Sequence, residues 1–143
     1  MRYWDSSALV PLLVDEPASP SILAEYLRDP EQIAWWATGI ECVSALVRAE
    51  REGRLATAAL AAAVDRLAAL ELAWAEVQPT DHLRELAIRL LRVHALRSSD
   101  ALQLAAAIVA AEGHAGSLTV VSLDERLNLA AEREGLRVVR PAA

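Results

Sequence analysis

The chain has 143 residues, which is enough for one domain with a substantial core and too few for two ordinary domains. Hydrophobic residues make up 55% of the sequence, and abundant alanine favours many helices packed closely on a thin sheet. The net charge of −6 excludes the broad basic surface of a general nucleic-acid-binding protein, although local arginines can still contact phosphate. We expect a single domain over residues 1–143.

The amino terminus and the cysteine content both favour the cytoplasm. The opening MRYWD leads straight into a predicted strand and lacks the basic and apolar regions of a signal peptide. The longest uncharged stretch, residues 101–111, is too short to span a bilayer. The single cysteine, Cys42, has no partner for an internal disulfide, so we expect a reducing compartment and a buried, inert thiol.

The first half of the chain alternates short apolar strands with helices. The predicted elements are, in order, a strand at 1–5, a helix at 6–14, a helix at 19–28, a strand at 32–36, and helices at 39–52 and 55–74. Ser6 or Ser7 is the expected cap of the first helix, and Thr38 is the expected cap of the third. Gly53 should close the third helix, so that it forms a helical hairpin with the fourth.

The second half continues the alternation. Its predicted elements are a strand at 76–78, a helix at 80–94 capped by Thr80, a helix at 100–112, a strand at 118–122, a helix at 124–134 and a strand at 136–139. The sequence GHAG at 113–116 should break the chain. The helix at 100–112 is apolar on nearly every side and should be the central buried helix. Short apolar strands separated by helices predict an α/β fold with a parallel sheet covered on both faces.

Four acidic residues lie where a predicted strand ends or a helix begins: Asp5, Glu41, Asp100 and Asp124. In an open parallel sheet the ligand crevice lies at the carboxyl ends of the strands. Asp5 ends the first strand, and Asp124 follows the fourth strand by two residues. Glu41 and Asp100 lie near helix starts that can face the same edge. The sequence therefore predicts one pocket that contains four carboxylates.

Four neighbouring carboxylates repel one another, which raises some of their pKa values until a hard cation binds. Magnesium and manganese prefer such oxygen ligands, and they support hydrolysis of phosphodiesters. A zinc site is not expected, because one cysteine and three scattered histidines lack the spacing of zinc ligands. Each acid also has an alternative role as a helix cap, most readily Asp124, whereas capping explains Glu41 least well. Arg97 and Arg126 are candidates for phosphate contact, with salt bridging as the alternative.

Four segments together resemble the motifs of PIN-domain ribonucleases, most closely the VapC-type toxins of bacterial toxin–antitoxin pairs. They are DSSALV (5–10), ECVSALVRAEREG (41–53), SSDALQLAAA (98–107) and VSLDERLNLAA (121–131). Ser6 stands where threonine is common in that family. The resemblance covers essentially the whole chain.

The resemblance implies a PIN-like three-layer α/β/α sandwich with a short parallel sheet in the order 3-2-1-4-5, which places Asp5 beside Asp124. It implies magnesium or manganese bound by the four acids, with Ser7 and Ser122 supporting the site through hydrogen bonds. It also implies an RNA substrate, a homodimer, and a cognate antitoxin whose tail lies in a groove beside the site.

The sequence therefore predicts a magnesium-dependent endoribonuclease that is the toxin of a type II toxin–antitoxin system. Two alternatives remain open. One is a catalytically inactive PIN-like module whose acids receive arginines from a protein partner. The other is a metal-dependent nuclease that is not a toxin.

Overall fold

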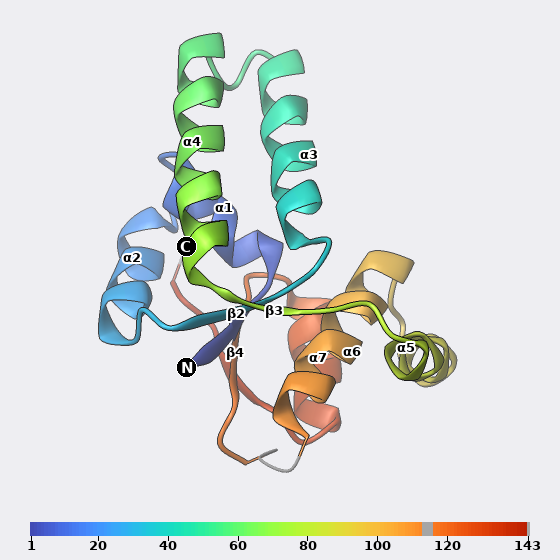
Figure 1. Cartoon of the computed structure of the whole chain (residues 1–143). Helices are drawn as coiled ribbons and strands as arrows, with labels where there is room; N and C mark the ends of the chain where they lie inside the picture. The colour runs from blue at the N-terminus through green and yellow to red at the C-terminus, as the bar shows by residue number, and fades with distance from the viewer. Residues whose placement is uncertain (113–115, 143) are drawn as a thin grey trace.

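Five parallel strands and seven helices make up the part of the chain that the computed structural model describes, residues 1–112 and 116–142 (Figure 1). The strands are β1 (Arg2–Trp4), β2 (Gln32–Trp35), β3 (Ala75–Val77), β4 (Thr119–Val121) and β5 (Arg137–Val139). The helices are α1 (Ser6–Leu13), α2 (Ser19–Arg28), α3 (Thr38–Arg51), α4 (Thr57–Ala73), α5 (Asp81–Val93), α6 (Ser98–Ala111) and α7 (Glu125–Arg133). Their order is the predicted one. The predicted break at 113–116 falls largely outside the described residues.

The sheet has the order β3-β2-β1-β4-β5, which confirms the predicted order. β1 lies at its centre, with Tyr3 opposite Ile33 of β2 and Val120 of β4. The pairing with β4 continues past β1, because the backbone N–H of Asp5 donates to the carbonyl of Val121 at 3.1 Å. All strands are parallel, so their carboxyl ends lie at one edge of the sheet, where ligands bind in such folds.

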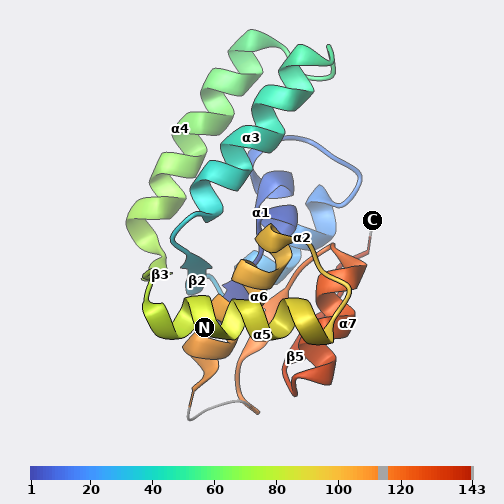
Figure 2. The same ribbon diagram turned by 90° about the vertical axis from the view of Figure 1, so that its right-hand side faces the viewer.

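Each short strand contributes side chains to two cores, because successive residues of a strand point to opposite faces. Tyr3 and Val120 pack into the core beneath α5, α6 and α7. Trp4 and Val121 pack into the core beneath α1 to α4. Figures 1 and 2 show these two groups of helices on opposite sides of the sheet. The predicted three-layer α/β/α arrangement is thereby confirmed.

α6 is the most buried helix, as the sequence predicts. Ala101, Ala105 and Ala106 are inaccessible to solvent and let the helix pack closely on the sheet. Leu104 is 1% exposed, and burial of such a side chain stabilises the fold by about 2 kcal/mol. One residue of this otherwise apolar segment is polar and equally buried, namely Gln103.

α3 and α4 form the predicted helical hairpin, which projects away from the sheet (Figures 1 and 2). Leu46 and Leu67 pack at its base in the core beneath α1 to α4. Gly53 follows the end of α3 with a φ of +75°, a left-handed conformation that glycine adopts without steric cost.

Several helix starts differ from the predictions. Asp5, rather than Ser6 or Ser7, caps α1. Thr38 is the first residue of α3 and does not cap it, because its hydroxyl accepts a hydrogen bond from Gln103 across the core. α6 begins at Ser98, so Asp100 lies inside its first turn.

The predicted burial of the single cysteine agrees with the structure. Cys42 is buried, and that burial raises the pKa of its thiol to about 12, so the thiol is unreactive at neutral pH. Among the described residues, no helix combines the length and the apolar character needed to cross a membrane.

Candidate active site

Asp5 lies directly after the central strand and is 5% exposed. Its Oδ2 accepts hydrogen bonds from the Ser7 hydroxyl at 2.5 Å, from the Ser7 backbone N–H at 3.2 Å and from the Ser122 hydroxyl at 3.3 Å. Burial raises the pKa of Asp5, the hydrogen bonds from Ser7 oppose this shift, and the charge of Asp124 adds to it. The carboxylate is thus held in one orientation, while its negative charge is poorly solvated.

Ser7 and Ser122 join the ends of β1 and β4. Their hydroxyl oxygens lie 3.3 Å apart, and each also accepts a backbone N–H from the segment after β4. Ser7 accepts from Leu123 at 2.9 Å, and Ser122 accepts from Asp124 at 3.0 Å. The two serines therefore fix the position of Asp5 relative to the segment that carries Asp124.

Asp124 and Asp100 both bind backbone N–H groups at a helix start. Oδ1 of Asp124 caps α7 by accepting from Leu127 at 3.1 Å, and Oδ2 of Asp100 accepts from Arg97 at 3.2 Å. The same two carboxylates line a cavity of about 370 Å³, which is also lined by Arg97, Ser99, Glu125 and Arg126. Asp100 and Asp124 therefore remain part of the site even though each also binds a backbone N–H group at a helix start.

Glu41 lies in the first turn of α3 and is partly buried. Burial raises the pKa of Glu41 to about 7; the hydrogen bond from Gln103 opposes the shift, and the charges of Asp5 and Asp100 increase it. Burial likewise raises the pKa of Asp100, with a further contribution from the charge of Asp124. Glu41 thus feels the charges of Asp5 and Asp100, and both of these feel the charge of Asp124, so the structure brings the four acids near one another at one edge of the sheet.

Arg97 and Arg126 lie at the mouth of this cluster. They line the cavity beside Asp100, and their charges lower its pKa. Neither guanidinium makes an ion pair within 4 Å with an acid in the described part of the chain. Both are exposed, so an anion entering the cavity can reach them.

A buried hydrogen-bond network behind Glu41 was missed by the sequence analysis. The Tyr3 hydroxyl donates to Oε1 of Gln103 at 2.5 Å. Nε2 of Gln103 donates to the Thr38 hydroxyl at 3.1 Å and also to Oε2 of Glu41. The available signal was the single glutamine in an otherwise apolar helix, since a buried amide needs partners for both of its ends.

The donor set fits a hard divalent cation, although it is not a closed cage. Over residues 1–112 and 116–142, no three His, Cys, Asp or Glu side chains converge closely enough to hold one ion by themselves. Magnesium, however, is usually held by one or two carboxylates and keeps several waters. Burial raises the pKa values of Asp5, Glu41 and Asp100, and the charges of neighbouring acids add to each shift, so such a cation would offset negative charge that is poorly solvated here.

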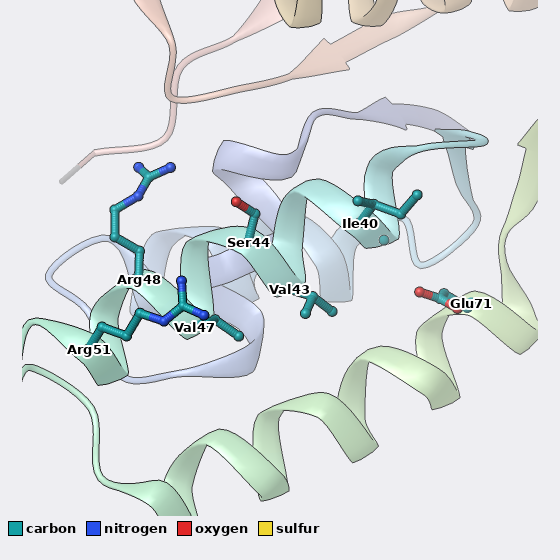
Figure 3. A pocket seen from close by; sticks show the side chains of 8 residues that line it. Ile40, Val43, Ser44, Val47, Arg48, Arg51 and Glu71 are labelled. Carbon is teal, nitrogen blue, oxygen red and sulfur yellow. The ribbon is translucent and has the colours of Figure 1, made fainter.

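A second, larger cavity of about 700 Å³ lies between α3 and α4 (Figure 3). Its apolar lining comes from one face of α3: Ile40, Val43 and Val47. Arg48 and Arg51 lie at one end of this α3–α4 groove, and Glu71 of α4 lies at the other.

At the Glu71 end of the groove, the Glu71 side chain lies against Gly39 near the start of α3. A Cβ at Gly39 would meet Oε1 of Glu71, so a larger residue at this position would displace the Glu71 side chain. α3 therefore borders the groove along one face and presents Glu41 to the acidic cluster from its first turn.

The sequence matches no protein-family model and no curated protein, whereas solved structures match closely in fold. VapC20 of Mycobacterium tuberculosis, described as a sarcin-ricin loop cleaving toxin, superposes with a TM-score of 0.69 and 18% identity, covering 91% of this chain and 95% of that one. A chain of a toxin–antitoxin complex from Klebsiella pneumoniae superposes with a TM-score of 0.65 and 18% identity, covering 99% of this chain and 98% of that one. FitAcB from Neisseria gonorrhoeae superposes with a TM-score of 0.67 and 16% identity, covering 99% of this chain and 98% of that one.

The chain thus has the PIN-like α/β fold of VapC-type toxins over nearly its full length. The resemblance first seen in four short motifs is confirmed at the level of the whole fold. The five-stranded parallel sheet and its order agree with that assignment.

Proposed function

We propose that the protein is a magnesium- or manganese-dependent endoribonuclease and the toxin of a toxin–antitoxin pair. The observation that carries this proposal is the gathering of Asp5, Glu41, Asp100 and Asp124 at the carboxyl edge of the sheet, where burial and mutual repulsion raise the pKa of three of them. RNA as the substrate class is supported by the similar fold of VapC20, which cleaves the sarcin-ricin loop.

In this proposal each residue has a role that its contacts support. One or two of the four carboxylates would hold the cation directly, and the others would act through the waters it keeps. A bound cation would supply an activated water and offset charge on the phosphodiester. Ser7 and Ser122 keep the Asp5 carboxylate in place through its Oδ2. Arg97 and Arg126 bind the entering phosphate from the rim of the cavity, where their charge also offsets the negative charge of the acids.

The decisive experiment is cleavage of RNA by the purified chain with magnesium or manganese. Asp5→Asn and Asp100→Asn should each reduce the cleavage rate by about 100-fold or more, because each removes a ligand charge. Asparagine is the suitable replacement, since it keeps the capping hydrogen bonds of these positions. Asp65→Asn, on the exposed surface of α4, is the matched control. Full activity of either site variant, or full activity in excess EDTA, would refute the proposed mechanism.

The biological role is tested separately from the chemistry. Expression of the chain in a host that lacks the proposed antitoxin should arrest growth and yield a specific cleaved RNA. A nuclease that is not a toxin would cleave RNA in vitro without arresting growth. An inactive binding module would bind a partner tightly but would bind no magnesium at millimolar concentration and would cleave nothing.

The antitoxin is proposed to dock in the α3–α4 groove. Exposed apolar side chains, with Ile40 64% exposed, suit an amphipathic segment of the partner. We expect that segment to carry an acidic residue where it meets Arg48 and Arg51 and a basic residue where it meets Glu71. Occupation of the groove would place the partner against the helix that carries Glu41.

A further inference from the structure

Gln103 is the one polar side chain on the inner face of α6, and all of its hydrogen-bonding groups have partners. It is 1% exposed, and both Tyr3 and Thr38, which it contacts, are completely buried. Its carbonyl oxygen accepts from the Tyr3 hydroxyl at 2.5 Å, while its amide nitrogen donates to Thr38 at 3.1 Å and to the carboxylate of Glu41. The amide therefore joins the central strand, α6 and α3 at one point.

The direction of this amide follows from the chemistry of its neighbours. An ionised carboxylate only accepts hydrogen bonds, so the NH₂ end faces Glu41 in the form that binds a cation. The carbonyl end then faces the Tyr3 hydroxyl, which can donate to it. The reversed amide would set its oxygen against the Glu41 carboxylate and leave that carboxylate without its donor.

An apolar side chain at position 103 would satisfy the packing of α6 more simply. The neighbouring residues 104–107 are apolar and at most 1% exposed, and a buried amide adds nothing to the core unless each end is bonded. The one partner of Gln103 that reaches the acidic cluster is Glu41, which lies in the first turn of α3.

We infer that Gln103 is a positioning residue that holds the Glu41 carboxylate in the orientation needed for cation binding, and that Tyr3 sets the direction of the Gln103 amide. The inference rests on the proposed function, in which Glu41 is one of the cation ligands. Neither Gln103 nor Tyr3 touches the cation or the substrate. Both act only through Glu41, as the hydrogen-bonding partners of metal ligands commonly do.

The test compares three variants of the full chain: Gln103→Leu, Tyr3→Phe and the control Leu104→Met. Gln103→Leu keeps most of the volume but none of the hydrogen bonds, and Tyr3→Phe removes a single hydroxyl. Leu104→Met changes the same helix without touching the network. Manganese affinity is measured by titration calorimetry, and the side-chain amide of Gln103 is observed by NMR in the cation-free protein.

Gln103→Leu should weaken manganese binding by about tenfold or more, Tyr3→Phe should weaken it by less, and Leu104→Met should leave it unchanged. In the cation-free protein, the Gln103 amide resonances should shift in both Tyr3→Phe and Glu41→Gln. Wild-type manganese affinity in a folded Gln103→Leu variant would overturn the inference while leaving the proposed function intact. If the wild-type chain binds no manganese, the proposed function fails. In that case the inference is tested by NMR alone, and unshifted Gln103 resonances in Glu41→Gln would overturn it.

Discussion

Glu41 is the residue whose ionisation most clearly links the site to stability. Its pKa in the folded, cation-free protein is raised from 4.5 to about 7, chiefly by burial. The unfolded chain releases this proton near the ordinary value, whereas the folded chain retains it to near neutrality. The stabilisation that Glu41 provides is therefore complete below the unfolded pKa and is lost as the pH rises through the folded pKa.

We therefore expect the free energy of unfolding of the cation-free protein to fall between about pH 5 and about pH 8 relative to that of Glu41→Gln, which cannot ionise at this position. Urea denaturation in EDTA across this range measures the difference. Parallel profiles of the two proteins would contradict the prediction. Added magnesium should restore stability at the upper end of the range in wild type more than in the variant, because the ion binds the folded, ionised form.

At the scale of single residues, the sequence predicted the four acids but not the hydrogen-bond network of Tyr3, Thr38 and Gln103 behind Glu41. Asp5, Glu41, Asp100 and Asp124 were recognisable because each has a local signal, a strand end or a helix start. Gln103 has no such signal, since its partners Tyr3 and Thr38 lie 100 and 65 residues away in the chain. Such contacts become visible only when the fold brings the segments together.

Among the elements, α3 connects the two cavities. Its first turn presents Glu41 to the acidic cluster, and its face toward α4 lines the α3–α4 groove. Its last turn carries Arg48 and Arg51, which lie at the end of the groove opposite Glu71 (Figure 3). One helix therefore serves both the proposed catalysis and the proposed antitoxin binding.

Arg51→Glu should weaken the complex with the antitoxin by about tenfold or more, because it sets like charges against each other at the acid-binding end of the groove. Arg92→Glu is a matched control, since Arg92 also lies in the last turn of a helix and its replacement has the same effect on the helix dipole. Affinities for the proposed antitoxin are measured by calorimetry. RNA cleavage by free Arg51→Glu should remain at the wild-type level. Equal affinities of Arg51→Glu and wild type would exclude this groove as the docking surface.

Element types and their order followed from the sequence, whereas several helix starts did not. Thr80 caps α5 through its hydroxyl, as its position before an apolar run predicted. Thr38 stands in an equivalent sequence context, yet it caps nothing, because Gln103 takes its hydroxyl as an acceptor. Local pattern cannot distinguish the two threonines, since the competing partner of Thr38 comes from a distant helix.

At the scale of the whole molecule, the homodimer remains a prediction. Size-exclusion chromatography with light scattering should give twice the chain mass of 15.5 kDa in the absence of antitoxin. A concentration-independent mass of one chain would contradict it. The measurement does not depend on nuclease activity, so it can be made on the wild-type protein or on Asp5→Asn.

The alternation of short strands and helices was sufficient to predict a parallel sheet with helices on both faces. The order of the strands was not determined by that pattern, because right-handed crossovers allow several orders. The order 3-2-1-4-5 came from the resemblance of four motifs to the VapC-type toxins, and the structure confirms it.

The placement of the acids along the chain has a consequence for synthesis. The cluster joins Asp5, near the start of the chain, to Asp124, which is positioned by Ser7 and Ser122 only after β4 has paired with β1. A growing polypeptide therefore cannot assemble the site before the segment that carries β4 and Asp124 has left the ribosome. Under the proposed function, an unfinished chain therefore has no nuclease activity, and a partner would need to inhibit only chains that have folded through β4 and α7.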